Sequence, residues 1–172
     1  MENWTWGLLL IALTMAIHAT GIAFLAFATE RIRVRMESLN RLSLHHVLAI
    51  LIGLIGVVGL LLAALHGVEA ALWAAAYWWL GAISSLADAI LYSVDSISTR
   101  GGSGLVLERQ WQPMGALEAV DGMLLFGIST AFIFAFMQIY WSIISMSAGV
   151  PLAAEHRRQH WGSGVATLRA HG

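Results

Sequence analysis

The stretch SSLADAILYSVDSISTRGGSG, residues 84–104, decides the fold, because it is patterned as a helix and loop yet too short to cross a membrane. Ser84 or Ser85 can cap a helix, and Asp88 stands three residues after Ser85 as its capping-box partner. The pattern predicts a helix over 84–99, followed by a glycine-rich loop over 99–104. The apolar residues that repeat at helical spacing are Leu86, Ile90, Val94 and Ile97.

The composition around this stretch is that of a membrane protein. The chain has 172 residues, of which 59% are hydrophobic and 11% are charged. Soluble domains are about 45–50% apolar and about 25% charged. The difference excludes an ordinary soluble globule, a disordered chain and a nucleic-acid binder, and it makes the lipid bilayer the expected partner. Cysteine is absent, which excludes disulfides and thiolate metal sites.

Three segments are long and apolar enough to span a bilayer, which predicts an all-α membrane protein of one domain covering 1–172. The first span is 6–28 and the third is 115–146. The second covers 47–83, with an uncharged run at 47–65 and an outer extension beyond it. Within that extension, the apolar stretch 70–83 is short for a span and typical of a re-entrant or interfacial segment.

Arginines predict the orientation. Those between the first two spans place that loop in the cytoplasm by the positive-inside rule, so the N-terminus is expected outside. Three spans then place the tail, 147–172, in the cytoplasm with its own arginines. The arginines concerned are Arg31, Arg33, Arg35 and Arg41 in the loop, and Arg157, Arg158 and Arg169 in the tail.

A short helix, a glycine-rich loop and a span, in that order, form the plan of a re-entrant pore loop. Irregular backbone at membrane depth persists only where it is buried in protein or lines a water-filled cavity. One copy of one loop cannot enclose a pore. The plan therefore predicts an oligomer, most simply a closed ring.

Three stretches give this order its specific form: LHGVEAALWAAAYWWLGAI at 65–83, ADAILYSVDSIST at 87–99 and WQPMGALEAVDGMLLFGISTAF at 111–132. They resemble the pore module of tetrameric potassium channels, in particular small bacterial proteins of the two-pore-domain/ion-transport type with an extra N-terminal span. The family's acid-bearing pore helix, Thr-rich turn, Trp, Glu, Gly and inner helix correspond here to Asp88, Thr99, Trp111, Glu118, Gly122 and residues 124–131. The resemblance implies a homotetrameric ion channel of a bacterial cytoplasmic membrane, with permeant monovalent ions and no bound cofactor.

The expected selectivity filter departs from that family. Potassium channels carry a TVGYGD-like sequence whose backbone carbonyls replace the ion's hydration shell. Residues 99–104 read TRGGSG, so only Thr99 and Gly101 match. The glycines make the loop more flexible, which predicts weakly selective cation conduction. The expected filter and pore residues are Ser98, Thr99, Arg100, Gly101, Gly102, Ser103 and Gly104.

Arg100 leaves three interpretations open. It can pair with Asp95 on the preceding helix, behind the loop. Alternatively, four Arg100 side chains about 8 Å apart in a lumen would repel by on the order of 10 kcal/mol, which requires accompanying anions and favours an anion-selective pore. A third possibility is a collapsed loop in a non-conducting membrane scaffold or regulatory subunit.

Other polar residues suggest supporting roles. His66 and Glu69, three residues apart, could sense pH or hold a metal. Two residues alone are a weak metal signal, so they are expected to form a hydrogen-bonded pair that braces the pore helix or the filter loop. Glu118 and Asp121 are expected at the outer mouth, as an acidic collar or as charges that stabilise the helix N-terminus. His18, in the first span, is expected to be a packing histidine. The expected inner pore and gate residues are Gly122, Gly127, Ser129, Phe132 and Phe136. No metal site is predicted, and no catalytic motif is present, so an enzyme is not expected.

Overall fold

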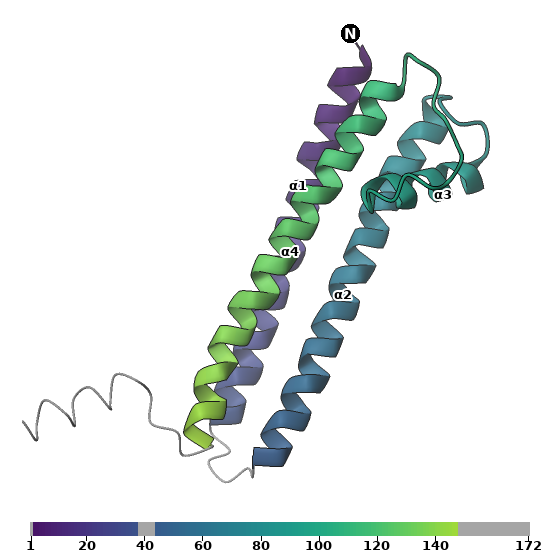
Figure 1. The fold of residues 1–172 in the computed structure, drawn as a ribbon. Helices are drawn as coiled ribbons and strands as arrows, with labels where there is room; N and C mark the ends of the chain where they lie inside the picture. Colours follow the sequence, from purple (N-terminus) through teal and green to yellow (C-terminus); the bar gives the residue numbers. More distant parts are fainter. Residues whose placement is uncertain (1, 38–43, 148–172) are drawn as a thin grey trace, which may run out of the picture.

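The computed structural model of the chain describes residues 2–37 and 44–147 and is all-α (Figure 1). Four helices follow one another over these residues: α1 (Glu2–Glu37), α2 (Leu44–Trp79), α3 (Leu86–Ile97) and α4 (Gln112–Ser147). By length and composition, α1, α2 and α4 are candidate membrane spans. The chain is therefore a multi-pass membrane protein with a short helix between its second and third spans. Arg41 and the tail beyond residue 147 lie outside the described residues.

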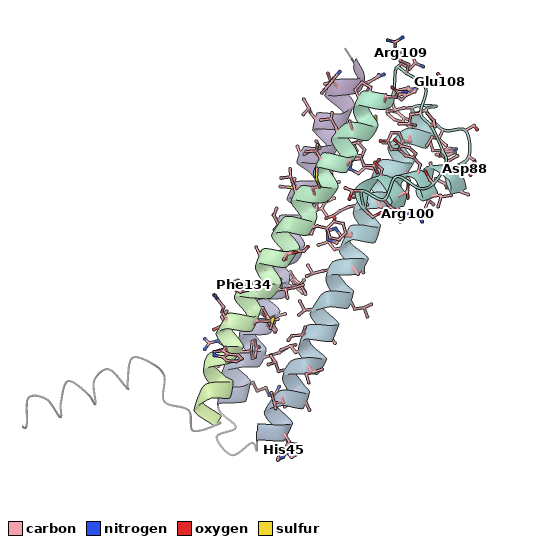
Figure 2. All side chains as sticks on the ribbon, in the orientation of Figure 1. His45, Asp88, Arg100, Glu108, Arg109 and Phe134 are labelled. Atoms are coloured by element: carbon pink, nitrogen blue, oxygen red, sulfur yellow. The ribbon has the colours of Figure 1, made fainter. Side chains whose placement is uncertain are left out.

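The three long helices each have 36 residues, which corresponds to about 54 Å. A bilayer core is about 30 Å thick, so both ends of each helix extend past it. The end at which α3 lies is called the outer end below, following the predicted orientation. Figure 2 shows the charged side chains of Asp88, Glu108 and Arg109 gathered there, with His45 at the opposite, inner end.

The stretch 70–83 was predicted as part of the outer extension of the second span and as typical of a re-entrant or interfacial segment. In the structure α2 continues through most of it, without a break to Trp79. Alanines and aromatic residues offer no stop signal before Gly81, which adopts a left-handed φ of 75° and turns the chain toward α3. The second span and its outer extension are thus a single helix.

Local signals at the starts of α3 and α4 are confirmed. Ser85 is the N-cap of α3, and its Oγ accepts a hydrogen bond from the Asp88 amide at 3.4 Å. Pro113 is the second residue of α4, where a missing amide hydrogen costs no helical hydrogen bond. The N-cap of α3 therefore follows from sequence alone, whereas α4 begins at Gln112, before the predicted start of the third span at 115.

The helices pack in an uneven bundle. α1 lies along α4, while α3 packs between the outer parts of α2 and α4 (Figure 1). The main core forms at this junction, around the fully buried side chains of Trp73, Tyr77, Met114 and Leu125. A smaller cluster of Leu25, Val58 and Leu62 joins α1 to α2 nearer the inner end.

α3 has its apolar face turned outward. Leu86, Ile90 and Val94 are 44–49% exposed, whereas the buried face carries small and polar side chains and, at its C-terminal end, Ile97. This is the reverse of a helix on the surface of a soluble protein. The arrangement suits a helix whose outer surroundings are lipid or another protein. The buried residues of α3 are Ala89, Ser93, Asp95 and Ile97.

The C-terminal end of α3 meets α4 at Gly122. A Cβ atom on Gly122 would lie 2.0 Å from the carbonyl oxygen of Ile97, so only glycine permits this approach. Gly122 therefore fixes how deeply the end of α3 sits against α4.

Replacing Gly122 with alanine is expected to destabilise the protein by about 1–3 kcal/mol, because backbone of α3 or α4 must shift to admit the methyl group. Gly127→Ala is a matched control on the same helix, since nothing lies within 4 Å of its added Cβ. Thermal unfolding in detergent, followed by circular dichroism, compares the two. An unfolding temperature for Gly122→Ala at or above that of Gly127→Ala would contradict the close contact.

Candidate functional site

The depth of the short helix can be measured along α1. Trp6 packs edge-on against Trp79 at a centroid distance of 5.8 Å, and tryptophans of this kind mark the membrane interface. Thr14 lies eight residues further along α1, about 12 Å deeper, and its hydroxyl donates to Asp121 Oδ2 at 2.7 Å. Gly122 follows Asp121 on α4 and contacts Ile97 at the end of α3. The end of α3 therefore lies about 12 Å beneath the outer tryptophans, within the length of the spans.

The loop after α3 turns sharply at this depth. Thr99 has a φ of 56° and Gly101 a φ of 63°, so a residue with left-handed backbone stands on each side of Arg100. The amides of Thr99 and Arg100 still close the helix end, on Ser96 and Asp95 carbonyls at 2.8 and 3.0 Å. Among the described residues, none donates a hydrogen bond to the carbonyls of 99–104. These carbonyl oxygens are available to water or ions.

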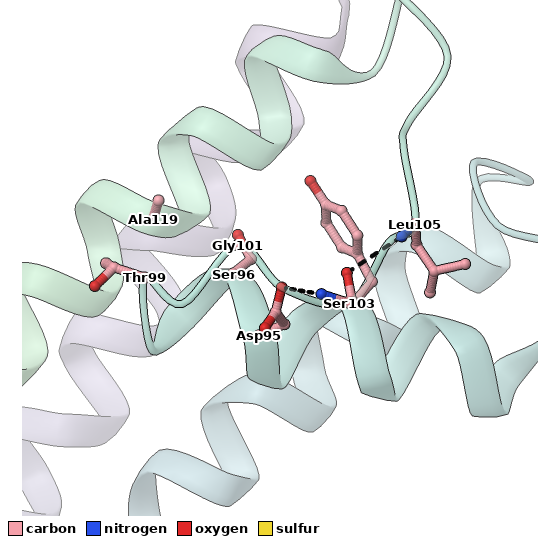
Figure 3. Close-up of a pocket in the computed structure, with 8 residues that line it drawn as sticks. Asp95, Ser96, Thr99, Gly101, Ser103, Leu105 and Ala119 are labelled. Atoms are coloured by element: carbon pink, nitrogen blue, oxygen red, sulfur yellow. Dashed lines mark hydrogen bonds between the residues drawn. The ribbon is translucent and has the colours of Figure 1, made fainter.

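Asp95 holds this loop in place. Its Oδ1 pairs with Arg100 Nε at 2.5 Å. Figure 3 shows its other contact, in which Oδ2 accepts the amide hydrogen of Ser103 at 2.8 Å. The Asp95 side chain is 4% exposed, whereas that of Arg100 is 64% exposed. Of the three interpretations of Arg100, the structure contains the ion pair with Asp95.

The pKa of Asp95 reflects two opposing effects. Burial raises the pKa, but the Ser103 amide and the Arg100 guanidinium outweigh it and hold the pKa below its ordinary value. The carboxylate is therefore ionised at neutral pH, as the pair with Arg100 requires.

An open pocket of about 340 Å³ lies beside the loop, bordered by α3, the loop and α4 (Figure 3). Its polar lining comes mainly from the hydroxyl groups of Tyr92, Ser96, Thr99 and Ser103. The predicted filter residues thus border a hollow rather than a packed interior. The lining residues are Tyr92, Asp95, Ser96, Thr99, Gly101, Ser103, Leu105 and Ala119.

Glu118 lies inside the bundle. Its side chain has no exposed surface, and it accepts hydrogen bonds from the Tyr77 hydroxyl at 2.9 Å and from the Ser93 hydroxyl. An acidic collar at the outer mouth would need this carboxyl group to face water, so that prediction is corrected. Glu118 instead ties α4 to α2 and α3.

Asp121 is also fully buried rather than at the mouth. Its Oδ2 accepts from Thr14 at 2.7 Å and from the Trp73 indole at 2.9 Å, which joins α4 to α1 and α2. Its Oδ1 has no partner among the described residues. α1, which supplies Thr14, packs mainly along α4 rather than on the outside of the second span, where the sequence pattern alone would place it.

Below Asp121, four polar side chains close a ring, which we call the histidine ring: His18, His66, Glu69 and Ser129. His18 Nδ1 lies 2.8 Å from Glu69 Oε1, and His18 Nε2 lies 3.0 Å from Ser129 Oγ. His66 Nε2 lies 3.2 Å from Ser129 Oγ, and His66 Nδ1 lies 3.2 Å from Glu69 Oε2. Each side chain is at most 10% exposed.

The ring changes several predicted roles. His66 and Glu69 were expected to brace the filter loop, but they contact His18 of α1 and Ser129 of α4. Ser129 was expected in an inner pore, and it is 5% exposed within the ring. Sequence reasoning missed Thr14, Trp73 and Tyr77 as donors. Each of them lies four residues from another buried side chain: Thr14 from His18, Trp73 from Glu69, and Tyr77 from Trp73. This spacing, which places two side chains on one helix face, was the available signal.

The remaining predicted inner residues are spread around α4. Phe136 is 4% exposed and packs on Tyr140 at a centroid distance of 4.6 Å, and the Tyr140 hydroxyl donates to the Thr29 carbonyl. Phe132 packs against the cluster of Leu25, Val58 and Leu62. Gly127 faces open space. Phe136 is therefore buried against Tyr140, and Tyr140 joins α4 to α1 within the chain.

Comparison with protein-family models, curated proteins and solved structures finds no match. The likeness to potassium channels therefore rests on the residues quoted above, and the function follows from the geometry as a proposal.

Replacing Asp95 with asparagine is expected to loosen the loop, because the charge that holds Arg100 and the Ser103 amide is lost. Hydrogen exchange measured by mass spectrometry would show faster exchange over 98–105. Asp88→Asn is the matched control, since Asp88 is an exposed acid on the same helix. Equal exchange in the two variants would exclude the pair as the loop's anchor.

The same contacts predict a pH dependence. Because the folded protein lowers the pKa of Asp95, the pair stabilises the loop above the ordinary value of 3.8 and is lost as pH falls through the lowered pKa. Loop exchange, corrected for the intrinsic effect of pH, should stay constant from neutral pH down to about pH 4 and rise below it. A rise already near pH 6 would point to histidine rather than Asp95.

Proposed function

We propose that several copies of this chain close into a ring and that the loop 98–104 of each copy lines a water-filled pore for monovalent cations. The observation that carries the proposal is irregular, polar backbone about 12 Å beneath the outer tryptophans. Such backbone is stable at membrane depth only when protein covers it or when it borders water. The chain itself leaves the loop exposed, so the covering must come from other copies.

The outward apolar face of α3 supports a ring. Leu86, Ile90 and Val94 form a stripe that a neighbouring subunit or lipid can cover, while the loop of the same segment is polar. A closed symmetric ring brings identical loops together at its axis. The resemblance to potassium channels favours four copies.

The ion pair supports cations over anions. With Arg100 bonded to Asp95, the guanidinium charge is balanced within each subunit. The carbonyl oxygens of 99–104, which accept no hydrogen bond from the described residues, are ligands suited to cations. A lumen bordered by carbonyl and hydroxyl oxygens attracts monovalent cations.

Selectivity among cations is expected to be weak. Gly101, Gly102 and Gly104 carry no side chain that packs behind the loop to hold its diameter. The Asp95 carboxylate anchors the loop at Arg100 and Ser103, and backbone hydrogen bonds hold the start of the loop to the end of α3. A loop without packed side chains behind its glycines adapts to both sodium and potassium.

Flux through liposomes tests the function. Purified protein is reconstituted, and potassium, sodium and chloride flux are measured side by side. We expect sodium and potassium to pass at comparable rates and chloride to be excluded. Arg100→Gln should alter cation flux because it leaves the Asp95 carboxylate unpaired, whereas Arg109→Gln, on the exposed outer loop, should not.

Two results would overturn the proposal. Chloride flux would place the Arg100 side chains in the lumen of an anion-selective pore. Absence of flux from a folded oligomer, tested over a range of pH and voltage, would indicate a non-conducting scaffold or regulatory subunit.

A further inference from the structure

The histidine ring lies apart from the loop and has no part in the proposed conduction. It draws His18 from α1, His66 and Glu69 from α2, and Ser129 from α4. His18 and Glu69 have no exposed surface, and His66 is 9% exposed. Polar side chains at this depth need partners or a bound ion, because lipid supplies neither.

The ring has one hydrogen atom too few for its four contacts. Its four contacts each need one hydrogen atom, but two neutral imidazoles and one hydroxyl supply only three, and an ionised carboxylate supplies none. The contact left without a hydrogen bond is the one between His66 Nδ1 and Glu69 Oε2. Both of these atoms are buried and without a hydrogen-bond partner among the described residues.

The geometry of that contact favours a metal ion over a proton. The two atoms lie 3.2 Å apart, within hydrogen-bonding distance, yet neither has a hydrogen-bond partner among the described residues, so the contact fails on alignment rather than on distance. A proton bridging them would need that alignment. A metal ion takes a position to the side of the line between two ligands, where both lone pairs can reach it.

The distances suit a small divalent ion. One ligand atom from each of His18, His66 and Glu69 lies within 4.8 Å of the other two. Tetrahedral ligands at about 2.0–2.2 Å from zinc lie about 3.4 Å apart, so the side chains need to move only slightly. Two histidines and one glutamate form a known type of zinc ligand set with one position open.

Ser129 completes the arrangement around the ligands. If both imidazoles bind the ion through Nδ1, both carry their hydrogen on Nε2. The two Nε2 atoms face the same Ser129 Oγ at 3.0 and 3.2 Å, and a hydroxyl oxygen has two acceptor lone pairs. Histidines that ligate metals usually donate their other N–H to such a partner.

The surrounding charge also fits. Asp121 is fully buried with Oδ1 unpartnered among the described residues, and its donors Thr14 and Trp73 lie one turn from His18 and Glu69. A divalent ion balances the Glu69 and Asp121 carboxylates together. We propose that His18, His66 and Glu69 bind one zinc-type divalent metal ion between α1 and α2, with Ser129 orienting both histidines.

Metal content tests this proposal directly. Protein purified without a polyhistidine tag is equilibrated with zinc, freed of excess ion and analysed by mass spectrometry for metal and protein. We expect one zinc per chain, lost in His18→Gln and in His66→Gln. His45→Gln is the matched control, since His45 is exposed at the inner end of α2, and it should keep the ion. Ser129→Ala should weaken zinc affinity about 10–100-fold.

A second measurement keeps the proposal falsifiable if the histidine variants do not fold. Cobalt(II) bound in a tetrahedral nitrogen and oxygen site gives visible absorption bands, which are read on the wild-type protein. Folded wild-type protein that takes up neither zinc nor cobalt would overturn the proposal, as would equal zinc binding by wild type and a folded His66→Gln variant. Both results are independent of ion flux, so the metal site and the pore stand or fall separately.

Discussion

Three carboxyl groups without exposed surface, Glu69, Glu118 and Asp121, determine how the helices of this protein can be assembled. Burying such a group is costly unless donors meet it, and here every donor to them comes from a different helix than the acid. Glu118 takes hydroxyl groups from α2 and α3, Asp121 takes partners from α1 and α2, and Glu69 takes an imidazole from α1. The polar contacts give the bundle a specificity that apolar packing against lipid cannot supply.

The position of the loop depends on this assembly. The Ser93 hydroxyl lies within hydrogen-bonding distance of both Glu118 and the Ala70 carbonyl, which fixes α3 between α4 and α2. The end of α3, at Ile97, then contacts Gly122. The loop that follows is held by the Asp95 carboxylate. Replacing Glu118 would therefore be expected to shift α3, and with α3 the loop that follows it.

Features set by neighbouring residues could be predicted from the sequence, and features set by distant helices could not. The three spans, the Ser85 cap and the Asp95–Arg100 pair depend on hydrophobic runs or on partners a few residues apart. Glu118 and Asp121 were placed at a mouth because the sequence does not say that Thr14, Trp73 and Tyr77 face them. His18 likewise meets Glu69 across 51 residues, so residue spacing could not predict that His18 joins His66 and Glu69 in the histidine ring.

The pairing of α1 with α4 also has a consequence for biosynthesis. Thr14 meets Asp121 across 107 residues, so α1 can find its main neighbour, α4, only after those residues have been synthesised. At about 5–20 residues per second, this interval is about 5–20 s. Until α4 has been synthesised, the only helix contacts of the described structure that are open to α1 are those with α2. His18 on α1 and Glu69 on α2 form one such contact, at 2.8 Å.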